Sequence, residues 1–295
     1  VHICDYNMLQ KVAADIPEDA LKLAEVFWPG PLTIILKKTS LIPDAVSAGL
    51  DTVGIRMPQN PVILEIISKT GLPLAGPSAN RSGRPSPTLA KYVMEDMEGR
   101  IDMVLDGGEV GIGIESTIVD LTGEVPEILR PGFVTKEMLQ DLLGQVETDQ
   151  TILTDAKDLK PKAPGMKYRH YAPQCQVVIV AGSREKAAAY IHAHYRKIDR
   201  VLCFEEELPL YKDCNPLAYG QEADERTLCA GLFAALRELD DPNVGMVYAR
   251  CPVGGGVAYA VQNRLKKAAA FHIVDAEEEM PPLCKGRCPE GAEGL

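Results

Sequence analysis

The side chains best suited to chemistry in this sequence are hydroxyls and guanidiniums at the ends, or on one face, of expected strands. They are Thr52, Arg56, Ser78, Asn80, Ser86, Ser116, Thr117 and Arg130. The sequence has no Ser/His/Asp order, no HExxH motif, no Walker A motif and no His/Cys cluster at metal-ligand spacing. Arginine binds anions through two N–H groups at once. This set favours nucleotidyl transfer between activated reactants, which the protein positions while it stabilises negative charge.

One stretch concentrates such residues. Residues 73–88 read PLAGPSANRSGRPSPT. Gly, Pro, Ser and Asn are the residues of turns, so an exposed loop is one interpretation, and composition alone favours it. The other interpretation is an anion cradle, in which side chains and backbone N–H groups ahead of a helix face a phosphate or carboxylate.

The elements that must position these residues alternate along the first half of the chain. Periodicity and capping signals predict helices over residues 17–27, 61–71, 87–98 and 135–144. Short apolar or alternating runs predict strands over 31–38, 51–58, 72–76, 101–108, 115–123 and 126–132. In 51–58 the alternation places Thr52 and Arg56 on one face, so a hydroxyl and a guanidinium share a surface.

The second half repeats a strand followed by a helix three times. The pairs are 175–182 with 184–197, 200–206 with 224–240, and 243–251 with 256–271. This order predicts a small parallel sheet with helices on its faces. The glycines at 254–256 could seat an anion, although a tight turn is the simpler interpretation.

Composition narrows the class of protein. The 295 residues are 46% hydrophobic, enough for two globular domains. A net charge of −11 argues against binding that depends on neutralising a nucleic-acid backbone. No apolar run is long enough to span a bilayer, and the first residues do not resemble a signal peptide, so we expect a cytoplasmic enzyme.

The eight cysteines are mostly dispersed through apolar segments, as expected for reduced core thiols. Cys284 and Cys288 form the one close pair, in CKGRC. A metal or redox role for that pair would need further ligands, and its role stays open.

Residues 145–173 are polar, then rich in proline and cations, as in a linker. They also contain KYRHY, which could stack on a base and pair with phosphates. A plain charged linker and a nucleotide-binding patch both fit the composition.

Six motifs in this order resemble the threonylcarbamoyl-AMP synthase family, in its long two-domain form. They are FWPGPLTIIL, TVGIRMP, GPSANRSGRPSPT, ESTIVDLT, ILRPG and APGMKYRHYAP. The resemblance extends from His2 to about residue 270 and includes NRLKKAA near the end. It implies an α/β fold: an N-terminal twisted, mostly open mixed sheet with helices, and a smaller C-terminal parallel α/β domain resembling a Rossmann fold.

The resemblance also implies a reaction. The family condenses L-threonine, bicarbonate and ATP to threonylcarbamoyl-adenylate and pyrophosphate, with Mg²⁺ expected on the ATP phosphates. Partner proteins then transfer the threonylcarbamoyl group to an adenosine of certain tRNAs, so contact with tRNA is indirect. Carried over by motif, the ATP-binding positions are Thr52, Ser78, Asn80, Ser86, Arg130, Tyr168 and His170, and the threonine-binding positions are His2, Arg56 and Ser116. No catalytic residue is assigned.

The expected domain boundaries follow the same pattern. We expect a nucleotide- and threonine-binding domain at 1–147, a linker or flap at 148–173, a C-terminal domain at 174–275 and a tail at 276–295. The family has an upstream segment with a Lys-x-Arg pair that meets the ATP phosphates, and we expect this chain to begin after it. Activity of this chain alone is therefore open.

Two alternatives come from other classes. One is a carbamoyl-transfer domain of the hydrogenase-maturation type, which shares the first-half motifs but is not expected to carry this linker and second domain. The other is a non-catalytic nucleotide- or RNA-binding relative, for which KYRHY and the nearby cations speak and the net charge does not.

Overall fold

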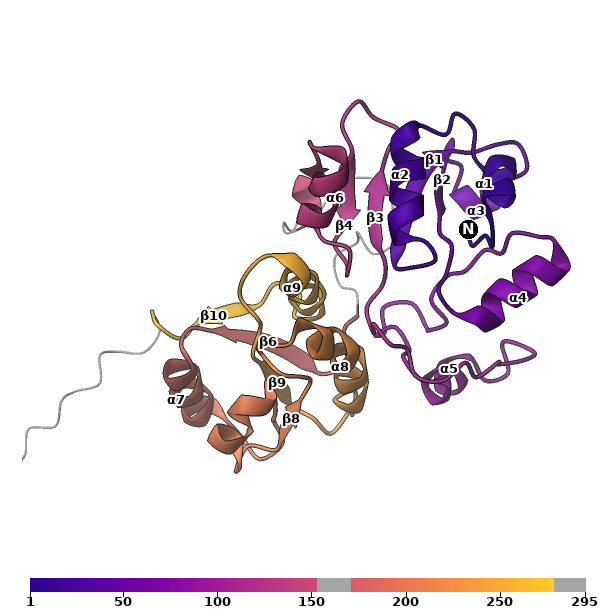
Figure 1. Cartoon of the computed structure of the whole chain (residues 1–295). Coiled ribbons are helices and arrows are strands. Elements are labelled where there is room, and N and C mark those ends of the chain that lie inside the picture. Colours follow the sequence, from indigo (N-terminus) through magenta and orange to yellow (C-terminus); the bar gives the residue numbers. More distant parts are fainter. Residues whose placement is uncertain (153–170, 279–295) are drawn as a thin grey trace, which may run out of the picture.

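The structure, a computed structural model, describes residues 1–152 and 171–278 and contains two α/β domains that lie side by side (Figure 1). Each domain has its own sheet. The predicted fold class, a mixed open sheet followed by a smaller parallel α/β domain, is confirmed. The predicted residues Tyr168, His170, Cys284 and Cys288 lie outside the described residues.

The first sheet has the strand order β2-β1-β3-β4-β5 in the described part of the chain. Its strands are β1 (Leu32–Lys37), β2 (Thr52–Ile55), β3 (Thr117–Asp120), β4 (Glu127–Arg130) and β5 (Glu147–Thr148). β1 pairs with β2 antiparallel and with β3 parallel, which makes the sheet mixed. β3 and β4 are antiparallel, and β4 and β5 are parallel.

Helices cover one face of this sheet and form its main core. The first domain contains α1 (Tyr6–Val12), α2 (Glu18–Phe27), α3 (Asp44–Ser47), α4 (Pro61–Thr70), α5 (Ala90–Met97), α6 (Lys136–Leu143) and the 3-10 helix η1 (Gln150–Ile152). The predicted boundaries of α4 hold because Asn60 caps its first N–H groups and Gly71, with φ of 66°, ends it in the left-handed region. Leu32, Ile34 and Leu36 of β1 point into the core, so the alternate residues face the other way.

The second sheet has the order β10-β6-β9-β7-β8 and is parallel throughout. Its elements are β6 (Gln176–Ala181), α7 (Arg184–His194), β7 (Arg200–Cys203), η2 (Glu205–Tyr211), β8 (Pro216–Ala218), α8 (Glu225–Glu238), β9 (Met246–Ala249), α9 (Gly256–Ala268) and β10 (Ile273–Asp275). The three predicted strand–helix units are present. The edge strands β8 and β10, which the sequence analysis missed, have only three residues each, too few to show a period.

Two predicted strands in the first half are wrong. Residues 101–108 form no strand, and Met103 and Leu105 are 72% and 62% exposed. Apolar alternation makes a strand only where a partner accepts its backbone hydrogen bonds, and the described residues supply none there. Residues 72–76 are reduced to one bridge, Leu74 with His2.

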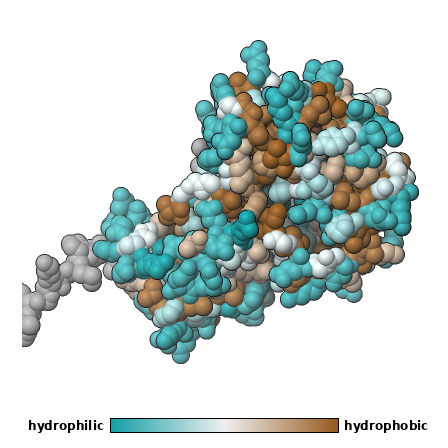
Figure 2. Space-filling model, in the orientation of Figure 1, coloured by the Kyte–Doolittle hydropathy of each residue, from teal (hydrophilic) through white to brown (hydrophobic). Residues whose placement is uncertain are grey.

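Apolar side chains on the surface are mostly interspersed with polar ones (Figure 2). Brown side chains gather in Figure 2 where Figure 1 shows α2 and α6. The exposed apolar residues of these two helices are Leu21, Val26, Met138 and Leu142. Within the described residues, no helix combines the length and apolar character that crossing a membrane requires.

Candidate functional site

The candidate site lies on the face of the first sheet opposite its main core. Pairing places Thr33 beside Ile118 on adjacent strands, and Ile118 beside Arg130. Directly paired residues share a face of a sheet, and so do residues two apart along a strand, which brings Ser116 to the same face. The same pattern puts Gly54 and Arg56 on this face, because Gly54 pairs with Ile35, two residues after Thr33. Predicted residues from separate motifs therefore gather on one surface.

Ser116 is the centre of this group. Its hydroxyl lies 2.7 Å from the Thr33 hydroxyl, and its side chain is buried. Arg130 donates from Nε to the Ser116 carbonyl oxygen at 3.0 Å and from Nη2 to Ser116 Oγ at 3.2 Å. A predicted nucleotide residue thus contacts a predicted threonine residue directly.

Arg56 and His2 lie side by side where β2 ends. His2 bridges to Arg56 and Leu74, and the N–H of Ile3 donates to the Arg56 carbonyl at 3.0 Å. Arg56 Nε donates to the Gly30 carbonyl at 2.8 Å, and among the described residues its two terminal nitrogens make no hydrogen bond, so they could fork onto a carboxylate. Burial lowers the pKa of Arg56, and the charge of Arg130 acts in the same direction. Burial, with neighbouring positive charge, also lowers the pKa of His2 to about 4, so this ring is neutral at pH 7.

Glu115 connects the site to the stretch 73–88. Its Oε1 accepts the Ser86 hydroxyl at 2.6 Å, and its Oε2 accepts Arg264 Nε of α9 at 3.1 Å. Burial acts to raise the pKa of Glu115, but the charges of Arg264 and Arg130 bring it below its usual value. We call Thr33, Ser86, Glu115, Ser116, Arg130 and Arg264 the site network.

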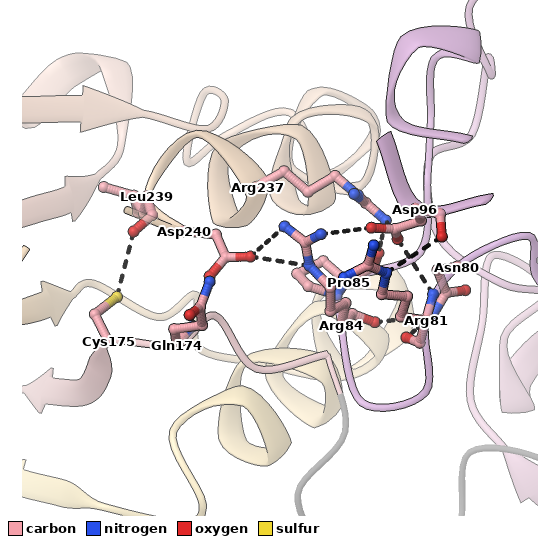
Figure 3. A network of polar contacts seen from close by, with 10 residues as sticks. All are labelled: Asn80, Arg81, Arg84, Pro85, Asp96, Gln174, Cys175, Arg237, Leu239 and Asp240. Atoms are coloured by element: carbon pink, nitrogen blue, oxygen red, sulfur yellow. Dashed lines mark hydrogen bonds and ion pairs between the residues drawn. The ribbon is translucent and has the colours of Figure 1, made fainter. Parts of the chain in front are cut away.

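A second polar network holds the stretch itself (Figure 3). Arg84 donates to Asp96 at 2.5 Å and to Asp240 at 2.5 Å, and both carboxylates are buried. Arg237 of α8 donates to Asp96 at 2.7 Å and to the Pro85 carbonyl at 2.6 Å. Asp96 also accepts the backbone N–H of Arg81. We call Asn80, Arg81, Arg84, Asp96, Arg237 and Asp240 the turn network. Through Arg237 and Asp240 of this network, the second domain contacts the stretch 73–88 directly.

The remaining predicted residues are less connected. Asn80 donates from Nδ2 to the carbonyls of Arg81 and Arg84, and its buried Oδ1 has no partner among the described residues. Ser78 is exposed. Thr52 begins β2, four residues before Arg56, which puts it about 13 Å away along the strand. The structure does not bring Thr52 into either network.

The end of the predicted linker reaches the same region. The N–H of Ala172 donates to the Gly83 carbonyl at 3.1 Å, and the N–H of Gln174 donates to Asp240 Oδ1 at 2.7 Å. Tyr171 lies close to Arg130, and burial raises the pKa of Tyr171 to about 12, so its hydroxyl keeps its proton. These contacts join the end of the linker to both networks.

Sequence reasoning missed Glu115, Thr33 and all contributions from the second domain. Glu115 stands directly before Ser116 in the EST motif, which offered a signal. Arg264 falls in NRLKKAA, a recognised motif that was given no role. Arg237 and Asp240 carry no sequence signal, because an arginine and an aspartate near the end of a helix are ordinary surface residues in most proteins.

A cavity of about 170 Å³ lies between the domains and is lined in part by Pro131, which follows Arg130. Gly132, Thr135 and Lys136 line one side, and Gly256 and Tyr259 of α9 line the other. Its lining includes Gly255 and Gly256 of the glycine run but none of the predicted ATP- or threonine-binding residues. Among the described residues, no group of three or more His, Cys, Asp or Glu side chains is placed to hold a metal ion.

Comparisons with known proteins cover both domains. Residues 1–132 match the Sua5–YciO–YrdC family, described as Telomere recombination, and residues 134–270 match the family described as Threonylcarbamoyl-AMP synthase, C-terminal domain. The threonylcarbamoyl-AMP synthase of Pyrococcus abyssi is 40% identical over 93% of this chain and 80% of its own length. That of Bacillus subtilis is 42% identical with the same coverage.

A solved structure agrees. The crystal structure of Pyrococcus abyssi Sua5 complexed with L-threonine superposes with a TM-score of 0.86 at 38% identity, covering 93% of this chain and 80% of that one. The matched part of the chain spans both domains. The chain therefore belongs to the threonylcarbamoyl-AMP synthase family.

Proposed function

We propose that this protein condenses L-threonine, bicarbonate and ATP to threonylcarbamoyl-AMP and pyrophosphate. The observation that carries the proposal is the contact between Arg130 and Ser116, which joins a nucleotide position to a threonine position on one sheet face. Arg56 lies on the same face, where its Nε donates to the Gly30 carbonyl. A carboxylate and a nucleotide phosphate bound by these residues would be neighbours.

The residues bind and orient, and the reactants supply the bonds. Arg56 would fork onto the threonine carboxylate. The threonine amine attacks the carbon of bicarbonate and water leaves; an oxygen of the resulting carbamate attacks the α-phosphorus of ATP, and the bond to the β-phosphate breaks with loss of pyrophosphate. Arg130 would offset the negative charge that spreads over the phosphate oxygens. Glu115 remains ionised, which suits it to hold cations and not to give up a proton.

The Ser86 hydroxyl has a defined share in this scheme. It donates its proton to Glu115, so it can offer a nucleotide only its oxygen, as an acceptor, unless it rotates. Ribose hydroxyls and the adenine amino group are donors that suit this oxygen. Phosphate oxygens, which only accept, do not.

Magnesium is expected to arrive with the ATP phosphates. The described residues offer no carboxylate or histidine set for a resident ion, and no step of this scheme passes through the metal.

The wider setting follows from the same proposal. The product is an activated acyl phosphate, which partner proteins would transfer to an adenosine of tRNA, in the cytoplasm. Residues 1–147 would form the substrate-binding domain, 148–173 the linker, 174–275 the second domain and 276–295 a tail. Ser78, Asn80 and Thr52, and Tyr168 and His170 of the linker, stay predicted nucleotide contacts.

Pyrophosphate release from ATP tests the proposal. The protein that carries this sequence is assayed with L-threonine and bicarbonate, then with each omitted, and the adenylate is identified by its mass. We expect release only when both are present, and R56K should raise the KM for threonine about tenfold or more while the KM for ATP changes little. Pyrophosphate release that does not depend on threonine would overturn the proposed reaction. Binding of tRNA that falls steeply with salt, without any release, would favour an RNA-binding relative instead.

A further inference from the structure

Arg264 is a second-domain residue that reaches into the candidate site. Its side chain is fully buried, and three of its contacts go to the first domain. Nη1 donates to the Pro131 carbonyl at 2.5 Å, Nε to Glu115 Oε2 at 3.1 Å and Nη2 to the Glu115 carbonyl at 3.4 Å. Pro131 follows Arg130, and Glu115 precedes Ser116. One guanidinium therefore holds the chain beside both residues.

Glu115 extends this grip to the stretch 73–88. Its second carboxylate oxygen accepts the Ser86 hydroxyl at 2.6 Å, so the order of contacts is Arg264, Glu115, Ser86. Without Arg264, Glu115 would lose the cation that pairs with it at 3.1 Å while still buried, and the carboxylate and the nearby Arg130 would shift in response. Both movements displace residues that are predicted to meet the nucleotide.

We propose that Arg264 is a positioning residue for ATP, through which the second domain holds Glu115, Ser86 and Arg130 in place. The inference rests on the proposed function, since it concerns the same nucleotide. It assigns the second domain a share in substrate binding, exerted through residues of the first domain. Lysine cannot replace Arg264, because an ammonium lacks the planar fork that reaches Pro131 and Glu115 together.

The chain offers a matched control in Arg250. This arginine is also buried, donates from Nε to Glu207 Oε1 at 3.0 Å and from Nη1 to the Val180 carbonyl at 2.6 Å, and makes these contacts within the second domain. R250K therefore damages a buried arginine pair of the same kind without touching the site.

The test measures ATP and L-threonine affinity by calorimetry, and urea unfolding, for wild type, R264K and R250K. We expect R264K to weaken ATP binding tenfold or more, and R250K to leave it within twofold, although both lower the urea midpoint. The inference is overturned if R264K binds ATP within twofold of wild type, or if R250K loses as much affinity as R264K. If wild type binds neither ATP nor threonine, the proposed function itself fails. That outcome is distinct from a failure of the Arg264 inference, which concerns only the difference between R264K and wild type.

A double variant covers the case in which R264K does not fold. R264M/E115Q removes both charges of the pair, so neither is left buried alone. It has lost the fork that positions Ser86 and Arg130, so we again expect at least a tenfold loss of ATP affinity. Binding within twofold of wild type would overturn the inference.

Discussion

The site network and the turn network use the same residue types for different ends. In both, a buried arginine on a helix of the second domain pairs with a carboxylate of the first. In the site network the chain of contacts ends on side chains predicted to meet substrates, Ser86 and Arg130. In the turn network Arg237 and Asp96 contact backbone groups of the stretch, the Pro85 carbonyl and the Arg81 N–H, and Asp96 also pairs with the Arg84 side chain. An interface between domains can thus hold a loop in place at one point and adjust a binding site at another.

The largest expected effect tests the turn network. R237M leaves Asp96 buried with one cation fewer, which should lower the free energy of unfolding by about 3–5 kcal/mol. Arg237 contacts the Pro85 carbonyl and Asp96, neither of which is a predicted substrate contact. The ATP affinity of the folded R237M protein should therefore fall less than that of R264K. Urea unfolding and calorimetry measure the two quantities.

R237M/D96N is the control for that experiment, since it removes both charges and leaves Arg84 with Asp240. It should recover much of the lost stability. The two networks would not differ in role if R237M lowered the free energy of unfolding by less than about 1 kcal/mol, or if it lost as much ATP affinity as R264K.

The next effect concerns charge in the site network. Lys267 lies one turn after Arg264 on α9, and burial, with the charges of Arg264 and Arg130, lowers its pKa to about 8. An unfolded lysine titrates near 10.5, so between pH 8 and 10.5 the unfolded state binds more protons and stability rises with pH. The rise attributable to Lys267 is up to about 3 kcal/mol.

K267M should remove that rise. The measurement is the difference in the free energy of urea unfolding between wild type and K267M at pH 7, 9 and 10. A difference is needed because buried tyrosines and thiols with raised pKa lower the stability of both proteins at alkaline pH. Equal pH dependence of stability in the two proteins would show that Lys267 does not cause the rise.

The smallest effect separates the threonine side from the nucleotide side. A Cβ at Gly76 would lie 2.5 Å from His2 Cε1, so G76A should push the His2 ring away and cost about 1–3 kcal/mol. We expect threonine affinity to fall about tenfold while ATP affinity stays within threefold. G111A, where a Cβ would meet nothing within 4 Å, is the control. An equal loss of both affinities would mean that the two sides are not separable.

The sequence predicted the first sheet where local signals were strong. The strand at 31–38 and the helix at 61–71 formed almost as expected, because their apolar faces and caps agree. Residues 101–108 failed, because a strand also depends on a distant partner. The site divides in the same way: Arg56, Ser116 and Arg130 could be named from motifs, while Arg264 and Arg237 matter only through contacts made more than 130 residues away along the chain.

Arg264 and Arg237 are carried by α9 and α8, which pack against each other in the second domain. Hydrogen bonds of 2.5–3.1 Å weaken within a few tenths of an ångström, so a hinge opening that leaves each domain rigid would break both networks together. The contacts of both networks across the interface would therefore be kept or lost together. A substrate that binds better while these contacts are made would stabilise them by its difference in affinity.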